Sequence, residues 1–258
     1  MTHRDKAPAG APCWLDLMTT DADATRRFYS ELLGWEPLEQ SAEFGGYFMW
    51  ANQGVPVAGG VGAESGQPAS RYWSVYLASD DAEKTAEIAA STGAQVIVPP
   101  TRVGDVGVMA VLIDPTGAQI GVWQPIEFPG FTELGVPGAP GWFELLTRDY
   151  ERAVEFYREV FGWDARVMSD TPEFRYTTLG EGEHALAGIM DAAGSLAADE
   201  DPHWSAYFIV SDTDATVSTA KKLGGRVLFE AQDTPYGRMA GLVDGGGSQF
   251  QVMGPTSG

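Results

Sequence analysis

One pattern of residues occurs twice along the chain, at a constant spacing of 128 positions. The spacings 142 − 14, 156 − 28 and 163 − 35 all give this value, for the pairs Trp14 and Trp142, Phe28 and Phe156, and Trp35 and Trp163. Further matches follow at nearly the same offset, between residues 72–77 and 203–208, 107–110 and 237–240, and 114–119 and 244–249. An internal repeat of this extent indicates two copies of one structural unit.

The repeat predicts the domain organisation. We expect an N-terminal tail over residues 1–11, a first module over 12–125 and a second module over 139–254. Prolines and glycines in residues 126–138 are typical of a linker between the two.

Each copy contains the same order of expected elements. In the first copy, residues 14–19 alternate like a strand, and Asp21 or Asp23 can cap a helix that runs through Leu33 and stops at Gly34. Residues 44–50 and 55–61 are expected to form further strands. A second set over residues 73–123 has its helix at 81–92. Each module is therefore predicted to be βαβββ followed by βαβββ, an α+β architecture.

The composition narrows the classes of partner. The 258 residues include 36 Asp and Glu against 16 Lys and Arg, a formal net charge of −20. Such a charge repels phosphate backbones and anionic lipids, so we expect no nucleic-acid and no membrane partner. Cys13 is the only cysteine, and residues 1–12 lack the apolar segment of a signal peptide. We expect a cytoplasmic protein, with non-classical export left open.

Three motifs accompany this order of elements. Phe-Tyr ends the first helix and Leu-Gly-Trp follows it, within residues 28–35, and Asp-Pro-x-Gly precedes the last strand at residues 114–117. Together they resemble the glyoxalase/bleomycin-resistance/extradiol-dioxygenase superfamily, which has the vicinal oxygen chelate fold. Two modules in one chain resemble the tandem actinobacterial type, whose members are often labelled hydroxylases or culture-filtrate antigens. The resemblance implies paired βαβββ units that form a curled mixed sheet around a cavity, with helices outside.

The resemblance also implies where a metal ion would be held. In metal-dependent members, ligands come from the first, fifth and last strands of a module: His or Gln, then His or Glu, then Glu. The corresponding positions are Trp14, Ser74 and Gly121 in the first module and Trp142, Ser205 and Gln251 in the second. An indole N–H only donates hydrogen bonds, and glycine has no side chain. We therefore expect neither a family-type metal site nor a cofactor.

A displaced cation is the alternative to this expectation. Asp16 and Glu144 lie two residues beyond the first-strand positions, and alternation puts them on the same face. Either could hold a divalent cation with Gln249 or Gln251. Hydrogen bonds from Trp, Tyr or amide groups would account for the same carboxylates without any site. His203 is expected to point away from the side chain of Ser205.

Aromatic side chains dominate the expected cavity faces. The candidate ligand-binding residues are Trp14, Ser74, Tyr76, Trp123, Trp142, Ser205, Tyr207 and Gln251. Aromatic walls with a few polar groups are typical of small-molecule pockets and suit a flat, apolar or cationic ligand. Core packing would account for the same rings equally well.

These observations predict a metal-independent binding protein of the bleomycin-resistance type, which sequesters an aromatic or cationic small molecule. The alternative is a glyoxalase-like lyase or a hydroxylase or oxygenase, with Glu144 or Asp16 as base or displaced metal ligand. A scaffold with filled cavities is a third possibility. The expected partner is a small molecule, and the chain is either a monomer with an internal pseudo-dimer or a homodimer.

Overall fold

The computed structural model describes residues 2–38 and 45–256 and has the predicted order of elements in both modules. The first module contains β2 (Pro12–Thr19), α1 (Ala22–Leu33), β3 (Glu36–Pro37), β4 (Phe48–Asn52), β5 (Val55–Gly62), β6 (Ser74–Ala78), α2 (Ala82–Ser91), β7 (Gln95–Val103), β8 (Gly107–Ile113) and β9 (Gln119–Pro125). A short pair, β1 (Thr2–His3) with β10 (Glu133–Leu134), joins the N-terminal tail to the linker.

The second module repeats this order and includes a 3-10 turn between its third and fourth strands. Its elements are β11 (Pro140–Thr147), α3 (Tyr150–Phe161), β12 (Ala165–Asp170), β13 (Arg175–Leu179), η2 (Gly182–His184), β14 (Ala187–Asp191), β15 (His203–Ile209), α4 (Thr213–Lys222), β16 (Arg226–Thr234), β17 (Gly237–Val243) and β18 (Gln249–Gly254). The α+β class and the two tandem modules are confirmed.

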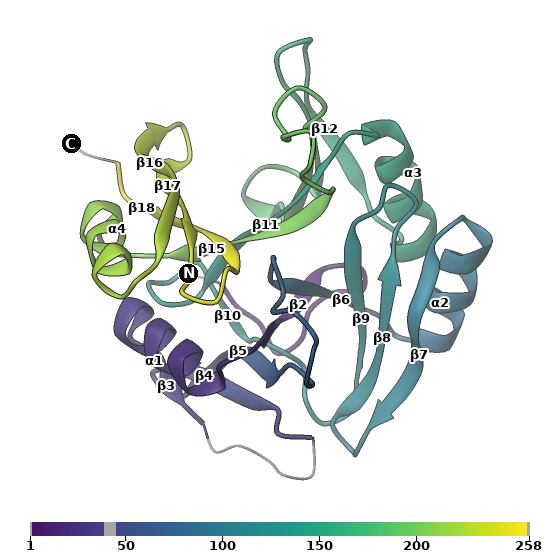
Figure 1. Ribbon diagram of the computed structural model, residues 1–258. Coiled ribbons are helices and arrows are strands. Elements are labelled where there is room, and N and C mark those ends of the chain that lie inside the picture. The colour runs from purple at the N-terminus through teal and green to yellow at the C-terminus, as the bar shows by residue number, and fades with distance from the viewer. Residues whose placement is uncertain (1, 39–44, 257–258) are drawn as a thin grey trace.

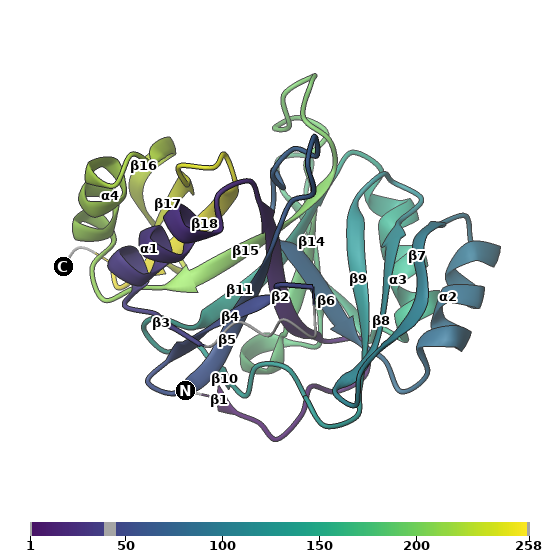
Figure 2. The same cartoon turned by 60° about the horizontal axis from the view of Figure 1, so that its bottom comes forward.

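Each module forms one eight-stranded sheet. The strand order is β3-β4-β5-β2-β6-β9-β8-β7 in the first sheet and β12-β13-β14-β11-β15-β18-β17-β16 in the second. The first strands of the two βαβββ units, β2 and β6 or β11 and β15, pair antiparallel at the centre. Each sheet curls but does not close, and its helices lie outside the curl (Figures 1 and 2).

Local signals in the sequence account for the helix boundaries. Asp21 accepts a hydrogen bond from Ala24 N at 3.0 Å and caps α1, and Gly34 ends it in the left-handed conformation. Asp81 and Asp212 cap α2 and α4 in the same way. None of the helices within residues 2–38 and 45–256 has the length and apolarity needed to cross a membrane.

One strand lies later than expected. The strand predicted at residues 44–50 runs instead from Phe48 to Asn52, and residue 44 itself lies outside the described residues. Gly45 and Gly46 have φ of 64° and 82°, left-handed values that form a turn before the strand begins.

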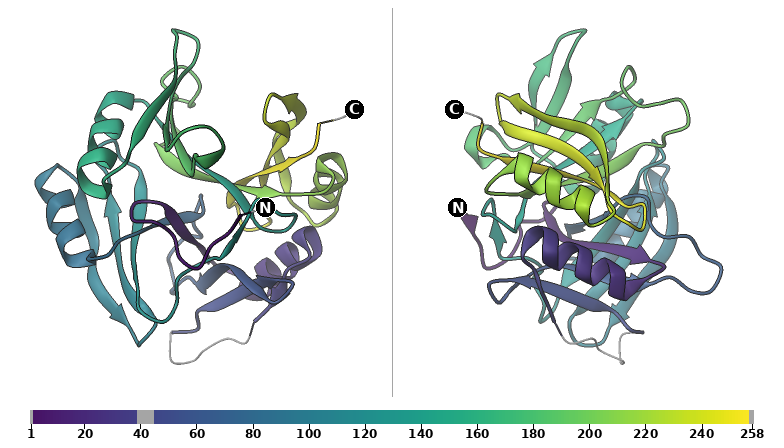
Figure 3. Two further views of the ribbon diagram at one scale, coloured as in Figure 1. Left: turned by 180° about the vertical axis from the view of Figure 1, so that it is seen from behind. Right: turned by 60° about the vertical axis from the view of Figure 1, so that its left-hand side comes forward.

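The repeated aromatic motifs pack the two modules against each other. Tyr29 on α1 donates to Asp244 of the second module at 3.0 Å, and Tyr157 on α3 donates to Asp114 of the first at 2.9 Å. All four residues are buried. Helix α1 lies beside α4, and α2 lies beside α3 (Figures 2 and 3). The motifs that mark the repeat in the sequence therefore form the joint between the copies.

The joint has approximate two-fold symmetry. Tyr72 stacks on its own counterpart in the repeat, His203, with ring centroids 3.7 Å apart and an interplanar angle of 6°. A residue that contacts its own counterpart lies next to a two-fold axis. The modules are thus paired inside one chain as two subunits of a symmetric dimer would be.

Candidate functional site

The strand register defines the concave face of the second sheet. Glu144 and Trp142 on β11 lie opposite Ser205 and Tyr207 on β15. Gln251 on β18 is the partner of Tyr207. Directly opposed residues project from the same face of a sheet. The sequence-predicted residues of the second module are therefore brought together on one face, with Glu144 at the middle of the sheet.

Glu144 is a buried carboxyl group among tyrosines. The residue is only 8% exposed. Tyr207 donates to Glu144 Oε1 at 2.8 Å, and Tyr176 on β13 also hydrogen-bonds to the carboxyl group. Burial raises the pKa of Glu144, and the two phenols partly oppose that rise.

Trp142 sets the direction of the hydrogen bonds around Glu144. Its Nε1 donates to the Tyr176 hydroxyl at 2.9 Å. Because an indole N–H cannot accept, the Tyr176 oxygen is the acceptor in that bond. The hydroxyl proton of Tyr176 is then free to point at Glu144. Tryptophan at this position therefore favours a carboxyl group that accepts hydrogen bonds.

The first module repeats this arrangement. Trp14 Nε1 donates to the Tyr47 hydroxyl at 2.6 Å, and Tyr47 donates in turn to Asp16 Oδ2 at 3.4 Å. Ser74, opposite Asp16 in the sheet, and Tyr76 also bond to this carboxyl group. Desolvation raises the pKa of Asp16 to about 6, although all three hydroxyls lower it. The hydrogen bonds that would account for both carboxyl groups without a cation site are therefore present.

Sequence reasoning missed Tyr47 and Tyr176. Neither lies in a motif of the repeat, but each faces a glycine on the next strand. A Cβ on Gly59 would lie 2.0 Å from the Tyr47 hydroxyl, and a Cβ on Gly188 would lie 2.0 Å from the Tyr176 hydroxyl. These matched Tyr and Gly pairs were the signal that could have identified both phenols.

The aromatic corner of the first module is covered. Trp14, Tyr76 and Trp123 are all buried. The ring of Phe128 from the linker lies edge-on to Trp14 with centroids 4.8 Å apart, and its carbonyl accepts from Trp123 Nε1 at 2.9 Å. These candidate ligand-binding residues therefore contact other parts of the chain.

The same corner of the second module is open. Trp142 and Tyr207 are only half-buried, and half-buried Met253 occupies the position that corresponds to Trp123. Within residues 2–38 and 45–256, no ring packs on Trp142 as Phe128 packs on Trp14. Gln251 also differs from its counterpart Gly121, and its Oε1 is buried without a hydrogen-bond partner in the part of the chain that the structure describes.

Exposed apolar side chains surround this open corner. Phe229 on β16 opposes Gly241, which pairs in turn with Gln251, so Phe229 shares the concave face. Tyr236, 62% exposed at the β16–β17 turn, places its hydroxyl 3.6 Å from the sulfur of Met168 on β12. The β12–β13 and β16–β17 hairpins stand on either side of β11 and β15 (Figure 1). The Tyr236–Met168 contact therefore bridges the two edges of the curled sheet.

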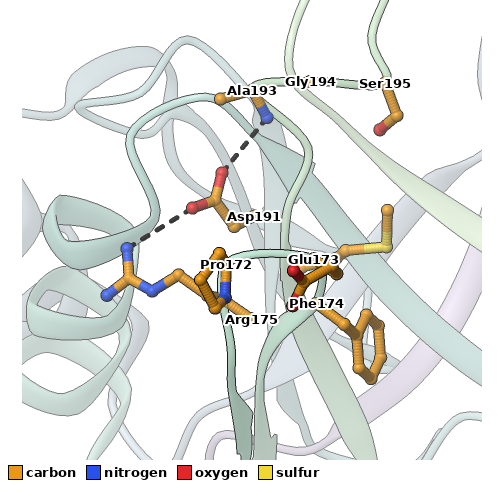
Figure 4. Close-up of a pocket in the computed structure, with 9 residues that line it drawn as sticks. Pro172, Glu173, Phe174, Arg175, Asp191, Ala193, Gly194 and Ser195 are labelled. Atoms are coloured by element: carbon orange, nitrogen blue, oxygen red, sulfur yellow. Dashed lines mark hydrogen bonds and ion pairs between the residues drawn. The ribbon is translucent and has the colours of Figure 1, made fainter.

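A pocket of about 380 Å³ lies beyond Tyr176, between the β12–β13 turn and the segment after β14. Phe174 in this pocket stacks on Tyr176 with centroids 5.4 Å apart. Arg175 in the pocket wall pairs with Asp170 and Glu151. It also pairs with Asp191, which accepts from the backbone N–H of Ala193 (Figure 4). Two carboxylates, one guanidinium group and one aromatic ring therefore line the pocket.

The expected orientation of His203 is wrong. His203 and Ser205 are two residues apart on one strand, so they point to the same side of the sheet, and the register pairs His203 with Leu146. His203 Nδ1 lies 2.9 Å from the Asp201 carbonyl oxygen, and burial lowers the pKa of the ring. Its ring also stacks on Tyr72.

The side chains around the two carboxyl groups do not fit a divalent metal ion. Glu144 and Asp16 are each surrounded by phenols and a serine, and hydroxyl groups are poor substitutes for the imidazole and carboxylate ligands such ions prefer. Across residues 2–38 and 45–256, no three His, Cys, Asp or Glu side chains are grouped so that they could hold a metal.

Comparison with known proteins agrees with this fold. The model of the Glyoxalase/Bleomycin resistance protein/Dioxygenase superfamily matches residues 13–122 and 139–252. The "Putative glyoxylase CFP32" of Mycobacterium tuberculosis is 35% identical over 263 residues, covering 99% of each chain. The "Anthracycline biosynthesis protein DnrV" of Streptomyces peucetius is also 35% identical, covering 95% of this chain and 93% of that one.

Solved structures share the fold at low sequence identity. The Mn(II)-bound glyoxalase from Novosphingobium aromaticivorans superimposes with a TM-score of 0.67 at 16% identity, covering 100% of this chain and 84% of that one. The 2,3-dioxygenase LapB from Pseudomonas sp. KL28 has a TM-score of 0.67 at 13% identity, with coverages of 97% and 94%.

These neighbours contradict the expectation that the protein uses no cofactor. A glyoxalase of the same fold holds Mn(II), so the family points to a metal cofactor. The expectation rested on the side chains at the family's ligand positions, and these indicate only whether an ion would bind at that place. The side chains there do not fit a divalent metal ion.

Proposed function

The chain belongs to the Glyoxalase/Bleomycin resistance protein/Dioxygenase superfamily, and we propose that it binds an aromatic or cationic small molecule on the concave face of its second module. One observation carries this proposal: the half-buried rings of Trp142 and Tyr207 stand beside the buried carboxyl group of Glu144. Aromatic walls with a single charged or hydrogen-bonding group are typical of sites for small organic ligands.

The chemistry of the wall defines the ligand class. The rings bind flat apolar groups by stacking or edge-on contact, and Trp and Tyr faces attract cations. Glu144 accepts a hydrogen bond or pairs with an amine. Two relatives are named for anthracycline biosynthesis, and anthracyclines are planar polycyclic compounds. These names support a polycyclic aromatic ligand for this chain.

Proton transfer by Glu144 is the second candidate function. A buried carboxyl group with a raised pKa is a stronger base once ionised and can remove a proton from a bound carbon acid. The name of the glyoxylase relative favours a lyase, and the dioxygenase neighbours share the fold. In this scheme Glu144 serves as the base in the second module and Asp16 is its counterpart in the first.

Tryptophan fluorescence can test binding, with 1-aminoanthraquinone and a quaternary ammonium derivative of anthraquinone as probes. We expect saturable quenching by both probes. Glu144→Gln should weaken the cationic probe about tenfold, or about 1.4 kcal/mol, and leave the neutral probe nearly unchanged. Asp16→Asn is the matched control, because its carboxyl group occupies the cognate position beside the covered corner.

The same samples separate binding from catalysis. Mass spectrometry of a recovered probe that is chemically unchanged supports a binding protein. A product that forms with the natural chain and not with Glu144→Gln would favour the proton-transfer function. Absence of saturable quenching by either probe would contradict the binding proposal.

A further inference from the structure

The linker residue Phe128 and the open corner of the second module are related by the internal repeat. We infer that Phe128 fills in the first module the place that a hydroxylated aromatic ring of the ligand fills in the second, so that the chain has one ring-binding corner and not two. This inference rests on the proposed function and adds the ring position, its hydrogen-bonding group and the number of sites.

The contacts of Phe128 show what this place accepts. Its ring meets Trp14 at an interplanar angle of 86° and lies 6.2 Å from Trp123. Its backbone N–H donates to the Val106 carbonyl at 3.1 Å, which holds the linker against the sheet. Edge-to-face contact of this kind is the preferred geometry for two neutral aromatic rings. The place beside the first-strand tryptophan is therefore one that fits a ring.

The repeat reproduces this place without its cover. Trp142 and Tyr207 correspond to Trp14 and Tyr76 on the central strands. In the first module the chain continues from β9 into the linker and returns Phe128 to the sheet. In the second module β18 ends at Gly254, and the following described residues, Pro255 and Thr256, are exposed. The second corner therefore keeps its ring-binding wall with no ring of the described chain upon it.

Two substitutions between the modules specify the hydrogen bonding of the ligand. Met253 replaces Trp123, so the corner lacks the indole donor that binds the Phe128 carbonyl, and a ligand needs no acceptor there. Gln251 replaces Gly121 and brings a buried Oε1 that has no hydrogen-bond partner among the described residues. A buried acceptor without a donor is costly, and turning the amide toward the corner would let a hydroxyl group on the ring satisfy it.

A pair of small probes tests this inference in the full-length protein. 2-Naphthol carries a hydroxyl group, and 2-methoxynaphthalene has the same rings without a donor. Titrations are followed by the indole N–H signals in ¹H–¹⁵N spectra, with the Trp14 and Trp142 signals assigned from Trp14→Phe and Trp142→Phe. We expect 2-naphthol to shift the Trp142 signal with 1:1 stoichiometry, and to bind about tenfold more tightly than the methyl ether.

Three further variants extend the test. Phe128→Ala should uncover the first corner, so that 2-naphthol also shifts the Trp14 signal and the stoichiometry becomes 2:1. Phe128→Leu, which keeps apolar packing without a ring, serves where the alanine variant is unstable, and should show the same second site more weakly. Gln251→Leu should remove the preference for 2-naphthol over the ether.

The outcomes distinguish this inference from the proposed function. A shift of the Trp14 signal in the natural chain, or no second site in either folded Phe128 variant, overturns the inference. If the anthraquinone probes bind but 2-naphthol leaves the Trp142 signal unchanged, the inference fails and the proposed function stands. If no probe of either kind binds, both fail.

Discussion

At the scale of single residues, the carboxyl group of Asp16 connects electrostatics to stability. Desolvation raises the pKa of Asp16 to about 6 from an ordinary value of 3.8, although three hydroxyl groups bond to it. The folded protein therefore binds more protons at Asp16 than the unfolded chain does between pH 4 and 6. The stability from this residue is fully present below pH 4 and is lost as the pH rises through 6.

Asp16→Asn should remove this pH dependence. Because only the natural chain loses this stability, the free energy of unfolding of the variant minus that of the natural chain should increase by on the order of 2 kcal/mol from pH 4 to pH 7. Urea denaturation at both pH values gives the difference. Asp5→Asn, which changes a fully exposed carboxylate, is the control. A constant difference between the variant and the natural chain at both pH values would contradict the prediction.

The sequence placed Asp16 and Glu144 correctly on the concave faces because alternation along a strand and the 128-residue repeat both apply to them. It did not reveal Tyr47 and Tyr176, which reach the carboxyl groups from other strands. Their contacts depend on the register of β4 and β13 against their neighbours, and bulges in those pairs shift that register. A pattern along one strand carries no information about such a shift.

At the scale of elements, a contact between two hairpins bridges the edges of the second sheet. Tyr236 at the β16–β17 turn meets Met168 on β12, and both side chains are well exposed. A contact between two exposed side chains adds little stability, and hairpin tips move more easily than the sheet below them. We therefore expect the two hairpins to separate when a ligand enters.

Tyr236→Ala should speed both entry and release of the anthraquinone probes several-fold, with little change in the free energy of unfolding. Stopped-flow quenching of tryptophan fluorescence measures the two rates. Tyr236→Phe removes only the hydroxyl–sulfur contact and should lie between the alanine variant and the natural chain. Unchanged rates in the alanine variant would show that the ligand enters by another route.

The order of elements was predictable, whereas the packing of the linker against the first sheet was not. Two copies of the pattern each predicted βαβββ twice, and the caps of α1, α2 and α4 lie where Asp precedes a helical run. Residues 126–138 were expected only to connect the modules, because Pro and Gly mark a turn and do not show where an apolar residue between them packs. The contact of Phe128 with Trp14 needs the tertiary structure.

At the scale of the whole molecule, the residues that identify the repeat stabilise the joint between the modules. The sequence showed that Phe-Tyr and Gly-Trp recur, and that an Asp with a Gly three residues later recurs before the last strand. It did not show that the Tyr of one copy donates to the Asp of the other. Trp35 and Trp163, which follow α1 and α3, donate to the backbone carbonyls of Gly138 and Gly10, which lie outside residues 12–125 and 139–254. A monomer with this internal pseudo-dimer, or a homodimer of it, stays a prediction.

The joint should make the two modules unfold together. Tyr29→Phe and Tyr157→Phe each remove a donor from a buried aspartate, Asp244 or Asp114, that lies in the other module. Each change should cost about 1–3 kcal/mol, because the carboxyl group loses a partner without regaining water. The pseudo-symmetry predicts similar losses for the two variants, and each should keep a single transition when urea unfolding is followed by both fluorescence and circular dichroism.

Tyr150→Phe is the matched control for these two variants, since Tyr150 bonds to Thr177 within its own module. It should destabilise the chain without altering the contact between the modules. Two separate transitions in Tyr29→Phe or Tyr157→Phe, with one module keeping its natural stability, would show that the modules are independent. A single transition in all three variants would show that the two modules unfold cooperatively, so that the second concave face, with Glu144 at its centre, is lost together with the first module.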